Sequence, residues 1–518
     1  MTERSERIAL AVRAARAADA LVLGDQDTLG TRDGRSVPKI ETGIPGFDAV
    51  TMGGLPRRRA TVLAGQAGSG KTVFSSHFLA EGIARRQPGV FVSLEEPAAD
   101  LRANLATLGW DIAAWEAAGD FAIVDASPLI RDDGSATTYN FETLAAQIGH
   151  AVDRTGAERL VLDSLNTVLA FEDNVAIARQ KLRGLISALR GMGLTIILTV
   201  ETPDDPGVTL SRFGVEEFVS DNVVLLRHVH EGKIRRRSVE VLKMRGAMHR
   251  KGDYAFTVLP GQGVVVLPQA VIQYEQQTTP RRITTGDVGL DAMTGGGFFE
   301  DSVILVTGPT GSGKTLVTSE FLAGGAEAGE KVLLLAYEES PGQIFRNAAA
   351  WGKDFQTYQE DGRLKVVALY PEVASLDDHL VEIMDVVERF EPTRIALDSL
   401  TSLERVGSSS AYREFVVGLV AFAKQQGISL MVTLSSRRLL GGSTVSEGQI
   451  STLTDAILLL RYIETDGTIE RVLTLLKMRG TAHDQDVRRY EITDSGLVIG
   501  EPFTSMSHVL TSGRGGDE

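Results

Sequence analysis

The 518-residue chain contains no cysteine, only 6% aromatic residues and no apolar run long enough to cross a membrane. Without cysteine it can form neither a disulfide framework nor a thiolate metal site. Without an apolar run of about 18 residues, no transmembrane helix is predicted. Basic residues are in the minority, with 53 Lys and Arg against 68 Asp and Glu, a net charge of −15. The acidic balance argues against a large basic nucleic-acid surface, although it leaves a local one open, and together these features predict a cytoplasmic soluble protein.

Glycine, by contrast, is abundant at 54 residues, and one glycine-rich motif occurs twice. Residues 65–72 read Gly-Gln-Ala-Gly-Ser-Gly-Lys-Thr, and residues 308–315 read Gly-Pro-Thr-Gly-Ser-Gly-Lys-Thr. Both match the phosphate-binding loop, in which backbone N–H groups close around phosphate oxygens, lysine supplies a cation and threonine supplies a Mg²⁺ ligand. We therefore expect two sites for ATP with Mg²⁺. The predicted nucleotide-binding residues are Gly65, Gly68, Ser69, Gly70, Lys71, Thr72, Gly308, Thr310, Gly311, Ser312, Gly313, Lys314 and Thr315.

The repetition extends well beyond these loops. Residues 42–55 before the first loop match residues 285–298 before the second, and both halves end their similarity at a Leu-Lys-Met-Arg-Gly segment. The chain is therefore a tandem duplication. We predict an N-terminal extension at 1–38, a first domain at 39–265, a linker at 266–283, a second domain at 284–505 and a short tail at 506–518.

Short apolar runs alternate with helical stretches in both halves. Residues 60–64, 195–200 and 302–307 have the composition of buried strands, and residues 179–191 have that of a helix. Strands alternating with helices indicate an α/β fold with a mostly parallel sheet flanked by helices. The phosphate loops then lie at the carboxyl ends of strands, where open α/β sheets bind ligands.

Acidic residues follow the predicted strands. An aspartate that ends an apolar strand is the usual organiser of Mg²⁺ in phosphoryl transfer, although it can also simply cap the next helix. A glutamate pair after a strand can orient or deprotonate the attacking oxygen, although it can also be a solvated turn. The predicted metal ligands are Thr72, Asp163, Thr315 and Asp398, and the predicted catalytic residues are Glu95, Glu96, Glu338 and Glu339.

The two Lys-Met-Arg motifs lie on strand-like segments, so the lysine and arginine of each motif face the same side. Such a fork suits a triphosphate, and a cation placed against the γ-phosphate accelerates transfer by about 10³ to 10⁵. Ordinary surface cations are the alternative interpretation. The predicted nucleotide-binding residues therefore include Lys243, Met244, Arg245, Lys477, Met478 and Arg479, with His249 and His483 as weaker candidates that also fit a turn cap.

One difference separates the halves. When Asp221 is aligned with Asp455, the hydroxyl pair Ser451–Thr452 falls opposite Glu217–Phe218. Surface drift would explain this difference without a function. The alternative is that the second half phosphorylates itself while the first half can only hydrolyse ATP.

Taken together, these motifs resemble the KaiC family, the double RecA-type ATPases and autokinase/autophosphatases of the bacterial circadian clock. The resemblance extends from about residue 40 to about residue 510, and its specific runs include 89–92, 214–224, 295–299, 336–340, 450–455 and 477–480. It implies two tandem RecA-like P-loop NTPase domains and a hexamer with ATP at the subunit interfaces. It also implies slow ATP hydrolysis in the first half and reversible phosphorylation in the second.

The resemblance further implies roles for individual residues and partners. Ser451 and Thr452 would be phosphosites, Glu338 the kinase base and Glu95 the residue that serves ATP hydrolysis in the first half. The Lys-Met-Arg cations would reach the nucleotide of a neighbouring subunit. KaiB and an output histidine kinase or other signalling protein are candidate partners, whereas the short polar tail argues against regulation by KaiA.

Two other classes of function use the same loops. A RecA-like nucleic-acid motor needs a basic, aromatic-rich groove for the strand, and the acidic composition counts against it. A signalling scaffold, whose ATP turnover only sets conformation, would not need the hydroxyl pair. The sequence therefore predicts an autophosphorylating serine/threonine kinase with ATP hydrolase activity.

Overall fold

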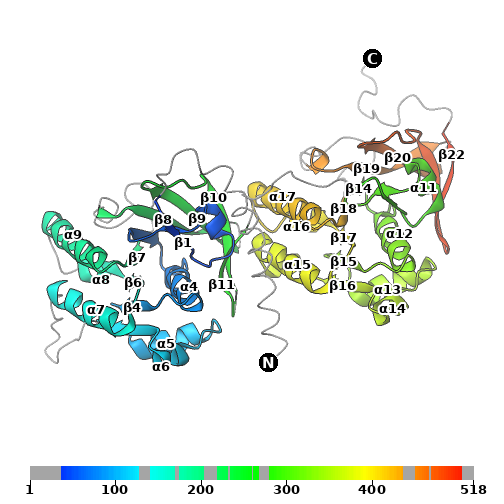
Figure 1. Cartoon of the computed structure of the whole chain (residues 1–518). Coiled ribbons are helices and arrows are strands. Elements are labelled where there is room, and N and C mark those ends of the chain that lie inside the picture. Colours follow the sequence, from blue (N-terminus) through cyan, green and yellow to red (C-terminus); the bar gives the residue numbers. More distant parts are fainter. Residues whose placement is uncertain are drawn as a thin grey trace, which may run out of the picture. The chain divides into compact units, whose positions relative to one another are not determined.

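The computed structural model describes residues 37–127, 141–169, 174–203, 219–231, 234–259, 261–267, 279–435, 450–465 and 468–503. It contains two compact units, which divide in the sequence between Leu267 and Thr279 (Figure 1). Each unit is built around a sheet of nine strands. The predicted fold class, tandem α/β domains with mostly parallel sheets, is confirmed.

The first sheet has the strand order β11-β10-β9-β8-β3-β7-β6-β4-β5. The strands from β8 to β5 pair in parallel, and β9, β10 and β11 extend the sheet with antiparallel pairs. A separate two-stranded ribbon joins β1 to β2. The strands are β1 (Lys39–Ile40), β2 (Leu55–Pro56), β3 (Ala60–Gly65), β4 (Gly89–Ser93), β5 (Phe121–Asp125), β6 (Arg159–Asp163), β7 (Thr195–Glu201), β8 (Asn222–Glu231), β9 (Ile234–Met244), β10 (Asp253–Leu259) and β11 (Gly263–Val266).

Helices cover both faces of this sheet because successive strand residues point to opposite sides. In β3, Val62 and Ala64 pack in a core with α7 and α9, whereas Leu63 packs in the opposite core with α4, α5 and α6. The helices are α3 (Phe47–Val50), α4 (Lys71–Ala84), α5 (Ala98–Ala106), α6 (Ile112–Ala118), α7 (Phe141–Thr155), α8 (Leu165–Leu169) and α9 (Val175–Gly191).

The second sheet repeats this topology, with the strand order β16-β15-β17-β18-β14-β19-β20-β21-β22. Its strands are β12 (Arg282–Ile283), β13 (Phe298–Phe299), β14 (Val303–Gly308), β15 (Val332–Ala336), β16 (Leu364–Ala368), β17 (Arg394–Asp398), β18 (Ser429–Ser435), β19 (Ala456–Thr465), β20 (Thr468–Met478), β21 (Arg488–Thr493) and β22 (Gly496–Pro502). Its helices are α11 (Val288–Thr294), α12 (Lys314–Glu327), α13 (Pro341–Ala350), α14 (Phe355–Glu360), the 3₁₀ turn η2 (Pro371–Val373), α15 (Leu376–Phe390), α16 (Leu400–Leu403) and α17 (Ser409–Gln425).

The phosphate loops occupy equivalent places in the two units. The loop at 65–72 joins strand β3 to helix α4, and the loop at 308–315 joins β14 to α12. Both strands lie inside their sheets, with parallel neighbours on each side. The predicted strands at 60–64, 195–200 and 302–307 correspond to β3, β7 and β14, and the predicted helix at 179–191 lies within α9.

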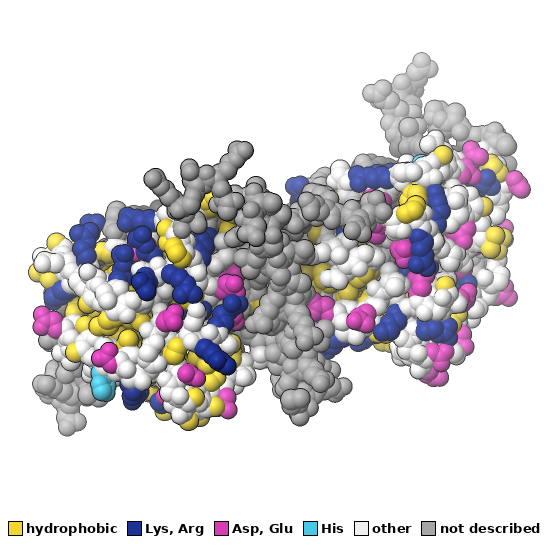
Figure 2. Space-filling view, viewed as in Figure 1, with side chains coloured by type: hydrophobic (Ala, Val, Ile, Leu, Met, Phe, Trp, Pro, Cys, Tyr) yellow, Lys and Arg dark blue, Asp and Glu magenta, His cyan; other side chains and the backbone are white. Residues whose placement is uncertain are grey.

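The surface is mixed in charge on the face that Figure 2 displays. Lys and Arg side chains are interspersed there with Asp and Glu on both units. Among the described residues, no helix is both long and apolar enough to cross a membrane.

Candidate nucleotide site

Glycines shape both phosphate loops. Gly68 and Gly70 have φ values of +71° and +97°, and Gly311 and Gly313 have +80° and +91°, in the left-handed region that side chains disfavour. Gly70 and Gly313 are the N-caps of α4 and α12, without any capping side chain. The first N–H groups of each helix therefore remain available to an anion, and the helix dipole favours one there.

The loop lysines lie across their own loops. Lys71 Nζ donates to the carbonyl oxygens of Gly65 and Gln66 at 2.8 and 2.9 Å. Lys314 Nζ makes the equivalent bonds at 2.9 Å, to Gly308 and Pro309. Burial lowers the pKa of both lysines, and nearby carboxylates oppose that shift. Each ammonium is thus held at the position where phosphate oxygens would compete for it.

The predicted metal ligands come together in both units. Thr72 Oγ1 donates to Asp163 Oδ2, and Thr315 Oγ1 donates to Asp398 Oδ2, each at 2.6 Å. The other oxygen of each aspartate accepts from a second threonine, Thr199 or Thr433. Burial raises the pKa of both aspartates, and these threonine bonds oppose the rise. A hydroxyl and a carboxylate oxygen form the hard donor set that Mg²⁺ prefers.

The first glutamate of each pair accepts hydrogen bonds from hydroxyl groups that follow the neighbouring strand, β6 in the first unit and β17 in the second. Glu338 Oε1 accepts from Ser399 Oγ and Ser402 Oγ, both at 2.7 Å. Glu95 Oε1 accepts from Ser164 Oγ and Thr167 Oγ1 at 2.5 and 2.7 Å. These hydroxyls follow the strand-end aspartates. The repeated Asp-Ser-Leu in the sequence would have predicted Ser164 and Ser399, whereas it does not extend to Thr167 or Ser402. Both glutamates are exposed, so their carboxylates are oriented yet accessible.

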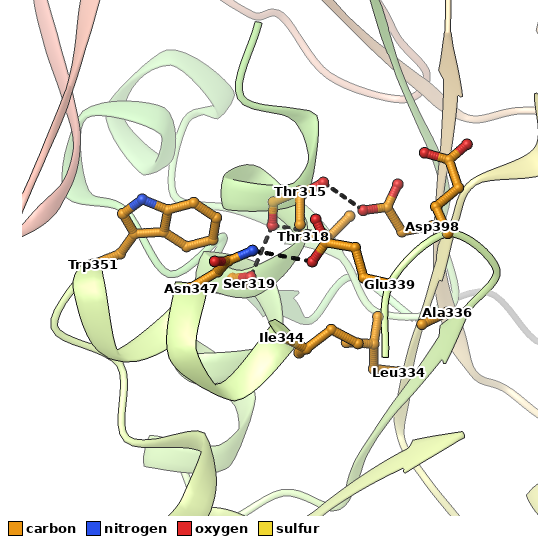
Figure 3. Close-up of a pocket in the computed structure, with 11 residues that line it drawn as sticks. Thr315, Thr318, Ser319, Leu334, Ala336, Glu339, Ile344, Asn347, Trp351 and Asp398 are labelled. Atoms are coloured by element: carbon orange, nitrogen blue, oxygen red, sulfur yellow. Dashed lines mark hydrogen bonds between the residues drawn. The ribbon is translucent and has the colours of Figure 1, made fainter. Parts of the chain in front are cut away.

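The second glutamate of each pair bonds to the helix that follows it, α5 or α13. Glu339 Oε2 accepts from Asn347 Nδ2 of α13 at 3.1 Å, as Figure 3 shows, and Glu96 is paired in the same way with Asn104 of α5. Burial raises the pKa of Glu339, and the nearby Asp398 adds to the rise. The structure therefore separates the members of each predicted catalytic pair.

A pocket in the second unit gathers most of these groups (Figure 3). Trp351 and Asn347 line it, although no sequence motif predicts either residue. Trp351 follows α13 directly, and the equivalent position after α5 in the first unit is Leu108. The lining residues are Thr315, Thr318, Ser319, Leu334, Ala336, Glu338, Glu339, Ile344, Asn347, Trp351 and Asp398.

The Lys-Met-Arg cations contact the segment that contains the predicted phosphosites. We call residues 450–455 the acceptor segment. Lys477 Nζ donates to the carbonyl oxygens of Ser451 and Thr454 at 2.8 and 2.6 Å, and Arg479 donates to that of Thr452 at 3.0 Å. Burial lowers the pKa of Lys477, and the positive charge of Arg479 lowers it further. Cations and acceptor hydroxyls thus share one edge of the second unit.

The remaining predicted residues are placed less uniformly. Lys243 Nζ donates to Ser220 O at 2.9 Å. The side chains of Met244 and Met478 are buried in the hydrophobic cores, so the structure gives them a packing role. His249 is half-buried with its pKa lowered by burial, and His483 Nε2 is buried with no hydrogen-bond partner among the described residues. Glu217 and Phe218 lie outside the described residues.

Comparison with known proteins identifies the family. The family model described as the KaiC ATPase matches residues 40–271 and 283–503. The circadian clock protein KaiC3 of Synechocystis sp. is 47% identical over 487 residues, which cover 94% of this chain and 95% of that protein. The circadian clock oscillator protein KaiC of Prochlorococcus marinus is 42% identical over 476 residues, with 92% and 95% covered. That of Synechococcus elongatus is 40% identical over 478 residues, with 92% of each chain covered.

The two matches to one family model confirm the duplication and, with the two nine-stranded sheets, the tandem RecA-like fold. The resemblance inferred from the motifs is confirmed as well, since each relative aligns along almost its whole length. The chain belongs to the KaiC ATPase family.

Proposed function

We propose that the chain is an ATPase and autokinase/autophosphatase of the circadian clock type, and that its second half phosphorylates Ser451 and Thr452. One observation carries the proposal. The second unit combines a phosphate loop, a hydroxyl–carboxylate metal pair and an oriented glutamate with an acceptor segment whose carbonyl oxygens are bonded to Lys477 and Arg479.

The residues fit both ATP and Mg²⁺. Thr315 and Asp398 offer only oxygen donors, which suits Mg²⁺ held by few protein ligands together with substrate phosphates. When bound, the ion would neutralise charge on the β- and γ-phosphates. Lys314 would exchange its loop carbonyls for phosphate oxygens, and the buried Ser312 Oγ, which has no hydrogen-bond partner among the described residues, would gain one.

Phosphoryl transfer in the second half needs one base and one acceptor. The acceptor hydroxyl gives its proton to the Glu338 carboxylate, and its oxygen forms a bond to the γ-phosphorus. The bond from that phosphorus to the β–γ bridging oxygen breaks, and ADP leaves. Ser399 and Ser402 keep the carboxylate in place. In the first half, water is the acceptor and Glu95 takes the role of Glu338.

We further propose a homohexamer with nucleotide at the subunit interfaces. Lys477 contacts the acceptor segment, whereas the phosphate loop of the same unit is served by Lys314. A nucleotide that reaches the acceptor hydroxyls from a neighbouring subunit would also reach Lys477 and Arg479. KaiB and an output signalling protein are candidate partners, and the cytoplasm is the proposed location. A nucleic-acid motor and a pure scaffold are not favoured, because neither uses the acceptor segment.

Intact-mass measurement tests the proposal. The purified full chain is incubated with Mg-ATP for a day with no other protein present. We expect species one and two phosphates heavier to accumulate in wild type and to be missing in Glu338→Gln. Light scattering on the same purified chain, with a non-hydrolysable ATP analogue in place of ATP, should show a hexamer. A wild-type chain that gains no mass would contradict the kinase, and a persistent monomer would contradict the assembly.

A further inference from the structure

A buried polar pair lies behind the sheet edge of the second unit. Tyr337 follows β15 directly and is 5% exposed, and His379 of α15 is 1% exposed. Their rings meet edge to face, with centroids 5.5 Å apart and planes at 84°. Within the described residues, neither the Tyr337 hydroxyl nor His379 Nδ1 has a hydrogen-bond partner.

The first unit has an apolar pair at the same two positions. Leu94 follows β4 as Tyr337 follows β15, and Leu144 is the fourth residue of α7 as His379 is the fourth of α15. Leu94 and Leu144 are fully buried members of one hydrophobic core. The equivalence of Leu94 and Tyr337 is also visible in the backbone, because each donates its N–H to the strand-end aspartate carbonyl at 2.8 Å.

The polar pair carries a cost in stability that the leucines avoid. A buried hydroxyl and a buried ring nitrogen without partners lose their hydration and gain nothing in return. Local departures of this kind from the best packing are found mainly at functional sites. The departure here occurs in the half that contains the acceptor hydroxyls.

The pair also connects two segments that leucine would leave unconnected. His379 Nε2 lies 3.0 Å from the carbonyl oxygen of Pro371 in η2 and donates to it. The Tyr337 ring rests on the His379 ring, and Tyr337 is followed by Glu338. The backbone just before Glu338 is therefore packed against α15 and, through one hydrogen bond, tied to the η2 turn.

We infer that Tyr337 and His379 are positioning residues for Glu338, holding the end of β15 so that the carboxylate meets the acceptor hydroxyl. The inference rests on the proposed kinase function. The effect comes from the ring contact and from the His379–Pro371 hydrogen bond, and the tyrosine hydroxyl is dispensable. Because the phosphate loop takes no part, the pair governs the rate of phosphorylation rather than the affinity for ATP.

Single variants separate the parts of this inference. Tyr337→Leu and His379→Leu install the side chains of the first unit and should slow phosphorylation at saturating Mg-ATP about tenfold or more, with the half-saturating ATP concentration unchanged. Tyr337→Phe keeps the ring and should phosphorylate at nearly the wild-type rate. His379→Gln keeps an N–H donor and should restore part of the rate lost in His379→Leu.

A matched control comes from α17. Tyr412 is also 5% exposed, with no partner for its hydroxyl among the described residues, and the first unit has Ala178 at its position near the start of α9. Tyr412→Leu should leave the phosphorylation rate near wild type. An equal loss in Tyr412→Leu would overturn the inference, since it would reveal a general packing effect. Wild-type phosphorylation rates in Tyr337→Leu and His379→Leu would overturn it as well.

Glu338→Gln distinguishes failure of this inference from failure of the proposed function. If Glu338→Gln abolishes phosphorylation while Tyr337→Leu and His379→Leu do not slow it, only the positioning role is wrong. If Glu338→Gln phosphorylates normally, or wild type takes up no phosphate, the proposed function fails and the inference fails with it. Should Tyr337→Leu not fold, the comparison of His379→Leu with His379→Gln decides the outcome.

Discussion

The two halves build the same candidate nucleotide site and surround it with different side chains. In each half a loop threonine lies 2.6 Å from a strand-end aspartate, and two hydroxyls hold the first glutamate. Around this shared geometry the side chains change, with Trp351 where the first half has Leu108, and Tyr337–His379 where it has Leu94–Leu144. The shared part is what a P-loop site for ATP requires, and the differences lie in the pocket wall and next to Glu338.

The contacts of the helix that follows the phosphate loop also differ between the two halves. In the second half, the half-buried Lys353 forms an ion pair with the buried Glu320, with an N–O distance of 2.6 Å. The equivalent places in the first half are occupied by Trp110 and His77, whose rings meet at 5.6 Å. At this position the contact of helix α12 is thus ionic, whereas the equivalent contact of α4 is aromatic. Both solutions keep the helix behind the phosphate loop in place.

The largest expected effect separates the two glutamates. Glu338→Gln should lower phosphorylation by about 10² to 10⁴, the range for loss of a general base, while much of the ATP hydrolysis remains. Glu95→Gln should lower hydrolysis and leave Ser451 and Thr452 able to be modified. Phosphate release and phosphate incorporation measured on the same samples provide the check. Equal loss of both activities in either variant would break the comparison between the halves.

Mixed hexamers test which subunit supplies the base. A chain with Ser451→Ala and Thr452→Ala cannot accept phosphate, and a Glu338→Gln chain cannot activate the acceptor. Mixed together with Mg-ATP, they should phosphorylate the Glu338→Gln chain, because transfer crosses the interface. Mass tags on the two chains identify the product. A silent mixture, with both parents shown to assemble, would rule out transfer between subunits.

A smaller effect is expected from the pocket wall. Trp351→Leu gives the second half the side chain of Leu108. Because Trp351 lines the pocket, we expect its ring to contact bound ATP, and stacking of an aromatic ring against a base is worth about 1 to 3 kcal/mol. The half-saturating ATP concentration for phosphorylation should therefore rise about tenfold, with no change for hydrolysis by the first half. Titration of ATP in both assays checks this expectation. If Trp351→Leu leaves the half-saturating ATP concentration unchanged, the adenine base of ATP does not stack on this residue.

The smallest expected effect is on the stability of the second half at acidic pH. Arg394 is buried against Glu330, with N–O distances of 2.7 Å, whereas its counterpart Arg159 bonds to the neutral Gln87. Burial alone would raise the pKa of Glu330, but its hydrogen bonds and the charge of Arg394 prevail and lower it. A lowered folded-state pKa adds stability above the ordinary value near 4.5, and that stability is lost as pH falls through the folded-state pKa.

The second half should therefore lose stability in mild acid through this pair. Glu330→Gln should lower the unfolding temperature of the second half by a few degrees at pH 7 and flatten its dependence on pH between about 5 and 3. Thermal unfolding over that range checks the expectation, with Gln87→Glu as the matched change in the first half. A pH dependence that survives Glu330→Gln would assign it to other carboxylates.

Contiguous motifs allowed much of the site to be predicted. The phosphate loops, the strand-end aspartates and the glutamate pairs each follow a strand in a fixed pattern, so their meeting at one sheet edge follows from the topology. Sequence did not predict Trp351, Ser402 or the Tyr337–His379 pair. Each is a single residue whose role arises from tertiary contacts, and no spacing marks it in advance. The methionines of the Lys-Met-Arg motifs are the opposite case. The motif predicted that they bind nucleotide, whereas the fold buries their side chains in the hydrophobic cores.

One measurement tests the central claim that only the second half transfers phosphate to the protein. The Ser451→Ala/Thr452→Ala chain is incubated with radiolabelled Mg-ATP, and phosphate released to solution and phosphate bound to protein are counted together. The account predicts that bound phosphate disappears while release continues at a rate close to that of wild type. Bound phosphate that persists at other residues, or release that stops together with incorporation, would contradict it.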